Sequence, residues 1–291
     1  MCCQSFRQVT LLTVFTTITF FASAQHVKEP KPTPADWSKP CQPFRIAGNL
    51  YYVGTYDLAS YLITTPQGHI LINTGLASSV KQIEKNIKTL GFRFTDIKIL
   101  LTTQAHYDHM GAMAAIKKKT GASLMVNEKD AAVVKDGGRS DYAFGTDTSN
   151  FQPVKPDRLL KDGDTIALGG MQLIMLHHPG HTKGSCSYIF TVEDEYRSWK
   201  VLIANMPTIV TDQPFNAIAR YPDVAKDYAY TLAAMKNLSF DIWVASHAGQ
   251  FDLHKKHKPG DTYYPSAFID REGYDESLKD LQKDYDKKMQ Q

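Results

Sequence analysis

The sequence has few cysteines and almost no excess of either charge. Four cysteines in 291 residues are too few for a disulfide-stapled scaffold. The formal net charge is only +3, and Lys117, Lys118 and Lys119 form the longest basic run, so the concentrated basic stripe typical of nucleic-acid binding is missing. Glycine and proline occur at ordinary frequencies, which excludes a collagen-like repeat. With 43% hydrophobic and 11% aromatic residues, the chain is predicted to fold around a substantial core.

A marked apolar run occurs only near the N-terminus. Arg7 is the one charged side chain among the first 24 residues, and the apolar stretch ends at the small residues Ala22, Ser23 and Ala24. The stretch is shorter than the roughly 18 to 20 apolar residues needed to span a bilayer. We therefore interpret residues 1–24 as a signal peptide and expect an exported, periplasmic protein without a membrane span.

Residues 25–43 contain five prolines and predict an extended arm rather than a packed element. Cleavage of the signal peptide would leave two cysteines, Cys41 in this arm and Cys186 in a predicted strand. The two could pair in an oxidising compartment, but two free thiols are the simpler expectation.

From Phe44 onward, short runs typical of strands alternate with helical patterns. Strands are predicted at 49–53, 60–64, 69–73, 97–103, 123–126, 165–168, 171–176, 185–192, 200–204 and 241–246, and helices at 79–90, 110–119, 224–238 and 277–289. Residues 135–150 predict a long polar loop. Strands followed by a helix recur in both halves with no linker between them, so residues 44–291 are predicted to form one domain with helices packed on sheets.

Residues 103–109, Thr-Gln-Ala-His-Tyr-Asp-His, stand between a predicted strand and a predicted helix. We expect an irregular turn here, because neighbouring side chains on a regular helix or strand point apart. Such a turn could aim His106, Asp108 and His109 at one point. Imidazole nitrogen and carboxylate oxygen are both zinc ligands, so the cluster predicts a metal site.

His181 and His247 also follow predicted strands, where functional side chains are commonly placed. The other histidines have less suggestive positions. His177 and His178 are weak candidates as ligands, whereas His26, His69, His254 and His257 are expected to be ordinary solvated or structural residues.

The His-X-Asp-His run at 106–109, the pair Gly180 and His181, and the strand-end His247 resemble the metallo-β-lactamase superfamily over residues 44–291. The resemblance implies an α/β fold, the αβ/βα four-layer sandwich, with two central mixed sheets and helices on both outer faces. The family motif usually reads His-X-His-X-Asp-His, and Gln104 occupies its first position here. Asn73 stands where an aspartate commonly supports a ligand histidine, so that support is expected to be weaker.

Other hydrolases of this superfamily carry an aspartate that bridges two metals near the position of Asn205, and other lactamase subclasses carry a cysteine near Met206. Neither group is present. What remains is similar to the subclass B3 metallo-β-lactamases, and the Gln-X-His-X-Asp-His form is similar to the GOB type. The resemblance implies zinc-dependent hydrolysis of the β-lactam ring of penicillins, cephalosporins and carbapenems by metal-bound hydroxide, which would give antibiotic resistance.

The resemblance also implies a ligand set. One zinc would be held by Gln104, His106 and His181, and the other by Asp108, His109 and His247. Asp108 would in addition orient the nucleophile, although its position also suits a helix N-cap. Because an amide oxygen is a weaker zinc ligand than imidazole, we expect one or two zinc ions per subunit, with the second site the tighter.

A β-lactam carries a carboxylate that needs an anchor, and Lys183, Ser185 and Thr208 are candidates for it. The expected partner is thus a small molecule, and the protein is expected to be a monomer. Two alternatives stay open. One is a lactonase or thioesterase-type hydrolase of the same fold, against which the absent bridging aspartate counts. The other is a non-catalytic zinc-binding protein, which would have closed metal sites rather than sites with an open position.

Overall fold

The structure is a computed structural model that describes residues 1–2 and 27–291. The predicted signal peptide, residues 1–24, lies outside the described residues apart from its first two. Within the described part of the chain, no helix is both long enough and apolar enough to cross a membrane.

The first sheet has seven strands that lie in chain order. They are β1 (Phe44–Ala47), β2 (Leu50–Tyr52), β3 (Tyr61–Thr65), β4 (Gly68–Ile72), β5 (Ile97–Leu101), β6 (Ser123–Asn127) and β7 (Arg158–Leu160). Strands β1 to β4 pair antiparallel, and β4 to β7 pair parallel. The carboxyl ends of β4, β5 and β6 therefore meet at one edge of the sheet, where loops can carry functional side chains.

The second sheet has the order β12-β11-β10-β9-β8. Its strands are β8 (Thr165–Leu168), β9 (Met171–His177), β10 (Cys186–Glu193), β11 (Ser198–Ala204) and β12 (Ile242–Ala245). Strands β11 and β12 pair parallel, whereas the other neighbours pair antiparallel. Both sheets are thus mixed, as the family resemblance implies.

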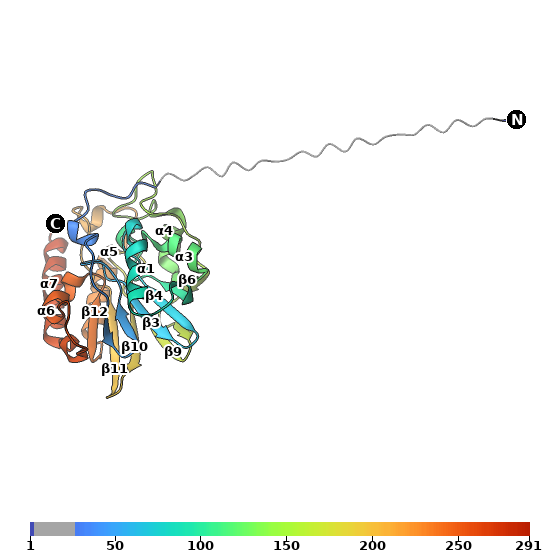
Figure 1. Cartoon of the computed structure of the whole chain (residues 1–291). Coiled ribbons are helices and arrows are strands. Elements are labelled where there is room, and N and C mark those ends of the chain that lie inside the picture. The colour runs from blue at the N-terminus through green and yellow to red at the C-terminus, as the bar shows by residue number, and fades with distance from the viewer. Residues whose placement is uncertain (3–26) are drawn as a thin grey trace.

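Helices cover the outer faces of the two sheets. They are α1 (Val80–Thr89), α2 (Tyr107–Met110), α3 (Met113–Thr120), α4 (Ala131–Asp136), α5 (Val224–Lys236), α6 (Leu253–Lys256) and α7 (Arg271–Met289). Figure 1 shows α6 and α7 on one flank of the strands and α3 and α4 on the opposite flank.

The alternation of side chains along β4 separates two apolar layers. Ile70 and Ile72 join the larger core, which also contains Leu173 and Tyr188 of the second sheet. Leu71 points the other way, into the layer under α1 and α3. The core between the sheets and the helical layers outside them confirm the predicted four-layer sandwich.

Several element boundaries differ from the prediction. The helix predicted at 110–119 corresponds to α3, and residues Tyr107–Met110 before it form a separate one-turn helix, α2, that was not predicted. The predicted loop at 135–150 begins inside α4. The short strands β1 and β7 were not predicted, because β7 has only three residues, two of them exposed, and so lacks a clear alternating pattern.

The expectation of an unpacked N-terminal arm is wrong. Val27 forms a β-bridge with Ser149, and a 3-10 turn at Ala35–Trp37 places the Trp37 ring with its centroid 6.1 Å from that of Tyr107. The arm is extended, as its prolines require, but it lies against the body of the protein.

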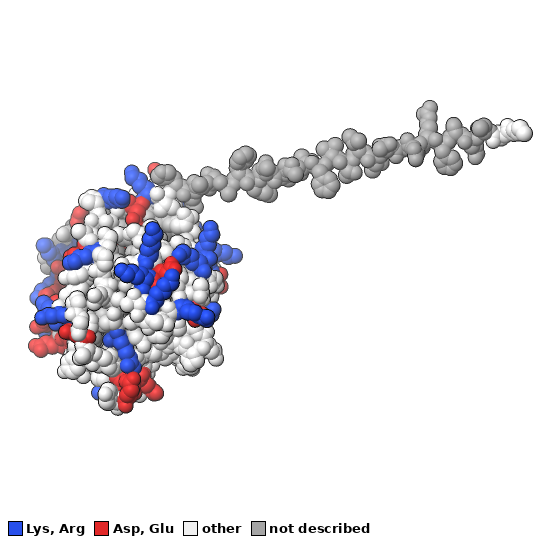
Figure 2. All heavy atoms as spheres, viewed as in Figure 1, with Lys and Arg blue, Asp and Glu red and all other residues white. Residues whose placement is uncertain are grey.

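Cys41 and Cys186 are free thiols, Cys41 half-buried and Cys186 buried, in agreement with the simpler expectation. On the face drawn in Figure 2, basic and acidic side chains are interspersed. Glu84 of α1 forms ion pairs with Lys88 of the same helix and with Lys119 of α3, so the second pair links two helices.

Candidate metal centre

The segment after β5 carries four of the predicted ligands. His106 is the N-cap residue of α2 and has an extended backbone, whereas Asp108 and His109 lie within this one-turn helix. The prediction of an irregular turn is therefore correct for His106 and wrong for the other two. The N-cap alternative for Asp108 is also wrong, because Asp108 is the second residue of the helix.

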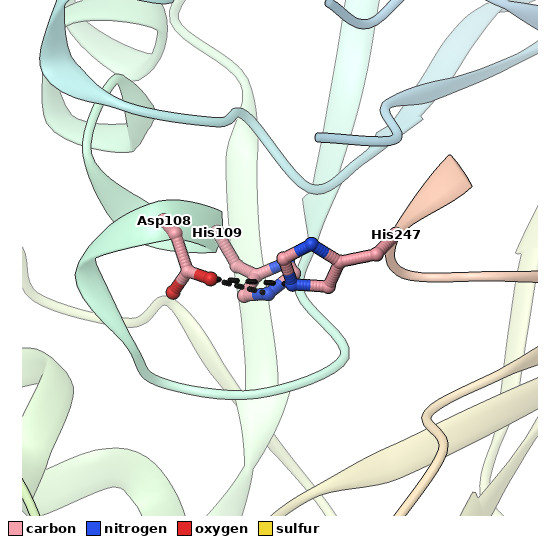
Figure 3. A group of neighbouring side chains, drawn as sticks. All are labelled: Asp108, His109 and His247. Carbon is pink, nitrogen blue, oxygen red and sulfur yellow. Dashed lines mark ion pairs between the residues drawn. The ribbon is translucent and has the colours of Figure 1, made fainter. Parts of the chain in front are cut away.

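Neighbouring residues converge here although the backbone is helical. Asp108 Oδ2 lies 3.2 Å from His109 Nε2 and 3.3 Å from Nε2 of His247, the second residue after β12. Ligand atoms of the three residues all lie within 4.8 Å of one another. Figure 3 shows the carboxylate and the two rings turned toward a common point. One carboxylate and two imidazoles form a donor set typical of a zinc site.

The electrostatics of this group follow from burial and from mutual contact. Burial would raise the pKa of Asp108, but the charges and hydrogen bonds of His109 and His247 hold it well below its usual range. Burial would lower the pKa of His247, but hydrogen bonds to Asp108 and Asp57 outweigh it and raise this pKa to about 9. Asp108 is therefore ionised, and without a metal the proton of His247 compensates its charge.

His106 and His181 form a second cluster, with their ring centroids 4.9 Å apart. His181 Nδ1 is 2.8 Å from the backbone oxygen of Thr208, which fixes the ring and leaves Nε2 as the free donor. Burial, together with the neighbouring His106, lowers the pKa of His181 to about 3. His181 is therefore neutral, the form that binds metal.

The second cluster includes a buried side-chain atom, Gln104 Oε1, with no hydrogen-bond partner among the described residues. Orphaned buried polar atoms are rare in folded proteins and need an explanation. A bound cation at the centre would satisfy this acceptor, so the residues present fit a metal.

Two carboxylates that the sequence analysis did not single out support the predicted ligands. Asp57 Oδ2 lies 3.0 Å from His247 Nδ1, which leaves the opposite nitrogen facing Asp108. Asp141 Oδ2, on the loop after α4, lies 3.4 Å from His106 Nε2. Asp57 is 190 residues from its histidine, so no local pattern in the sequence could have indicated it.

Other predicted residues have roles different from those expected. Asn73 has its hydrogen bonds with Thr102 and Thr103, so it supports the backbone before the motif. Ser185 is fully buried, and its hydroxyl donates to the backbone oxygens of His178 and Thr182. That hydroxyl is committed to the loop and does not face an open groove, which contradicts the role of Ser185 as a substrate anchor.

Other described histidines have structural contacts of their own, and His26 lies outside the described residues. His178 is buried and bonded to Ser187. His69 is buried in β4, in agreement with its predicted place in a strand. The prediction that His254 and His257 are merely solvated is wrong, because their rings stack on Tyr56 and Phe44 with centroids 3.7 Å apart in both pairs.

Comparison with known proteins places this geometry in a family. The family model for the metallo-beta-lactamase superfamily matches residues 55–194. Among curated proteins, a probable metallo-hydrolase of Burkholderia pseudomallei is 33% identical over 117 residues, which are 39% of this chain and 37% of that protein. A hydroxyacylglutathione hydrolase of Haemophilus influenzae is 29% identical over 40% of this chain and 55% of its own length. The chain thus spans about half or less of the length of these curated relatives.

Solved structures match over nearly the whole length. The class B3 di-zinc metallo-beta-lactamase LRA-12 from an Alaskan soil metagenome is 68% identical, with a TM-score of 0.89 over 90% of this chain and 100% of that one. The metallo-beta-lactamase GOB-18 from Elizabethkingia meningoseptica is 56% identical, with a TM-score of 0.91 over 92% of this chain and 99% of its own. The chain therefore belongs to the metallo-β-lactamase superfamily and, within it, to the class B3 metallo-β-lactamases.

Proposed function

We propose that this protein is a zinc-dependent hydrolase that opens the β-lactam ring of penicillins, cephalosporins and carbapenems and so gives antibiotic resistance. The observation that carries the proposal is the buried convergence of Asp108, His109 and His247 beside the pair His106 and His181. It is supported by near full-length similarity to class B3 enzymes at 56% and 68% identity.

The side chains present divide into two donor sets. Asp108, His109 and His247 would hold one zinc ion, and the orphaned Oε1 of Gln104 would complete a set with His106 and His181. When bound, zinc lowers the pKa of a coordinated water from about 15.7 to about 7 and polarises a carbonyl. Each set offers three protein donors, so an open position remains for solvent or substrate, which is typical of a catalytic rather than a storage site.

The chain's own residues supply orientation and charge. Asp108 is ionised and buried, so its carboxylate can hold both a metal and the proton of an attacking water in a fixed direction. Asp57 and the backbone of Thr208 fix the rings of His247 and His181. Lys183 is exposed, and its ammonium lies 5.4 Å from the ring centroid of Tyr221. Because it is two residues from His181, it would be the group that binds a substrate carboxylate.

The cellular setting follows from the same proposal. Residues 1–24 would direct export and be removed, residues 25–43 would form the arm, and residues 44–291 would form one catalytic domain in the periplasm. β-Lactams act on cell-wall synthesis in that compartment, so an exported enzyme would meet its substrate there.

Hydrolysis of the chromogenic cephalosporin nitrocefin by the zinc-loaded protein tests the proposal. Asp108→Ala should lower kcat/KM by at least about a thousandfold, because it removes a metal donor and the group that orients water. Asp284→Ala, which removes an exposed carboxylate on α7, should leave the rate unchanged. Turnover of lactones or thioesters without cleavage of nitrocefin, a penicillin or a carbapenem would favour the other hydrolase type instead.

A further inference from the structure

Asp130 is a buried carboxylate that belongs to neither donor set. It is the N-cap residue of α4, yet its side chain makes no capping hydrogen bond to that helix, and it is only 1% exposed. No Lys or Arg side chain among the described residues forms an ion pair with it. A buried carboxylate without a cation is costly unless hydrogen bonds replace its solvent.

Three donors from two distant loops satisfy this carboxylate. Oδ2 accepts a hydrogen bond from the backbone N–H of Ala105 at 3.0 Å and another from Thr182 Oγ1 at 2.7 Å. Oδ1 accepts one from the backbone N–H of Gly184 at 2.7 Å. None of these three donors belongs to α4, so the carboxylate bonds to the two loops and not to its own helix.

Each loop carries a predicted metal ligand next to its donor. Ala105 directly precedes His106, and Thr182 directly follows His181. Asp130 is therefore bonded to both chain segments whose imidazole rings lie 4.9 Å apart. Its bonds fix the backbone of these two segments relative to each other.

Close packing on Gly184 supports the same interpretation. A Cβ atom on this glycine would lie 2.6 Å from Cγ of Asp130 and 2.5 Å from its backbone nitrogen. Gly184 is not among the positive-φ glycines of the chain, so its backbone conformation does not require glycine. The absent side chain is instead what lets the carboxylate reach the loop.

We propose that Asp130 is a positioning residue that clamps the His106 segment to the His181 segment and thereby sets the zinc affinity of the Gln104, His106 and His181 site. The inference rests on the metal assignment above but not on the substrate. The other donor set has its own support, because Asp57 bonds to His247 and to the N–H of Gly249. Loss of Asp130 should therefore affect one site and spare the other.

Zinc competition titrations of the full protein test this selectivity. His106→Ala and His247→Ala first assign the two dissociation constants to their sites. Asp130→Asn keeps the shape of the side chain but places an amide N–H against at least one of the three donors. It should weaken zinc at the His106 site about ten- to a hundredfold and change the His247 site by no more than about twofold. Asp57→Asn makes the same chemical change beside His247, and it should weaken zinc at the His247 site while leaving the His106 site nearly unchanged.

A metal-free measurement keeps the test independent of hydrolysis and of zinc occupancy. In the apo protein, amide hydrogen exchange at Ala105 or at Gly184 should become at least about tenfold faster in Asp130→Asn, because the two N–H groups bond to different carboxylate oxygens and the amide keeps only one of these acceptors. Gly184→Ala, which forces the other loop away from Asp130, should also speed amide exchange and weaken zinc binding at the His106 site. Thr182→Val, which removes one donor, should have the same effects but smaller. These two variants decide the question if Asp130→Asn does not fold.

The outcomes separate a clamp from a merely structural role. A lower melting temperature with both zinc affinities and both amide exchange rates unchanged would overturn the proposal, as would equal weakening of the two sites. If nitrocefin is not hydrolysed but the selective loss of zinc is found, the proposed substrate is wrong and the clamp stands.

Discussion

Gln104 is the residue at which this centre departs most from a set of three imidazoles. Its amide oxygen is neutral and a weaker zinc donor than imidazole nitrogen. The structure buries this side chain to 3% exposure and leaves Oε1 without a hydrogen-bond partner among the described residues. A buried amide of this kind is held for a purpose other than packing, and it makes the two donor sets chemically unequal.

Gln104→His should therefore raise zinc retention. Replacement of the amide by imidazole gives the site with His106 and His181 three nitrogen donors, and after mild chelation the variant should keep close to two zinc ions per chain, where the unaltered protein keeps about one. Metal analysis by mass spectrometry measures this. Gln67→His, at an exposed turn residue, is the control and should bind no extra zinc. Two zinc ions equally resistant to chelation in the unaltered protein would contradict the prediction.

The sequence predicts the candidate ligands but not the residues that support them. Asp108 and His109 stand together in a recognisable motif, and His181 and His247 each follow a strand. Asp57 and Asp141 touch the ligands only through the tertiary fold, across 190 and 35 residues. Nothing in the local pattern around Asp57 distinguishes it from an ordinary turn residue, because its role depends on the β-bridge between Leu58 and His247.

The two described thiols other than Cys2 should be nearly inert in the folded protein. Burial raises the pKa of Cys41 to about 11, although nearby Lys39 lowers it, and burial raises the pKa of Cys186 to about 12. Because only the thiolate is nucleophilic, alkylation by iodoacetamide at about pH 8 should be slow, and for Cys41 it should speed up as the pH approaches 11. Denatured protein, whose thiols have ordinary pKa values, should react quickly at both positions. Mass spectrometry that finds the two cysteines joined would contradict the assignment of free thiols.

At the scale of elements, hydrophobic periodicity was sufficient for the long segments and insufficient for the short ones. Ile83 and Ile87 have helical spacing and lie on the buried face of α1, as predicted. The break between α2 and α3 was not visible, because Met110 and Met113 continue an apolar pattern across it. At this break a Cβ on Gly111 would lie 2.4 Å from the backbone nitrogen of Ala77, so only glycine lets the two chain segments approach this closely.

Asn86 should be a structural determinant of α1 although it is polar. It is buried on the same face as Ile83, and its Nδ2 donates to the backbone oxygens of Cys41, Val53 and Gly54 at 3.0 to 3.2 Å. Asn86→Ala would remove this donor from all three carbonyls, of which only that of Cys41 has a further side-chain donor among the described residues, Gln82 Nε2, and should lower the free energy of unfolding by about 1–3 kcal/mol.

Urea denaturation checks this value. Asn216→Ala, at an exposed position, is the matched control and should change the free energy of unfolding by less than about 0.5 kcal/mol. An equal effect of the two substitutions would show that the three bonds of Asn86 contribute nothing to stability.

For the molecule as a whole, the recurrence of strands and helices in both halves predicts helices packed on sheets, and the family resemblance implies the two sheets with helices outside. The recurrence did not predict how the halves meet. The structure places Asp108 and His109 after β5 of the first sheet, and His181 and His247 after β9 and β12 of the second. Each proposed metal thus has donors from both sheets and would act as a link between them.

Zinc should therefore stabilise the whole fold and not only its site. A ligand that binds the folded state alone adds RT ln(1 + [L]/Kd), about 2.7 kcal/mol when free zinc is a hundredfold above its dissociation constant. Chelation should lower the melting temperature measured by calorimetry, and added zinc should restore it. His247→Ala, which removes the donor from the second sheet, should lose most of this zinc-dependent rise in melting temperature. The control Asp284→Ala, at an exposed position far from the proposed donors in the sequence, should retain it. A melting temperature insensitive to zinc would mean that the two sheets are held together without the metal, and that the donors converge for some purpose other than the one proposed.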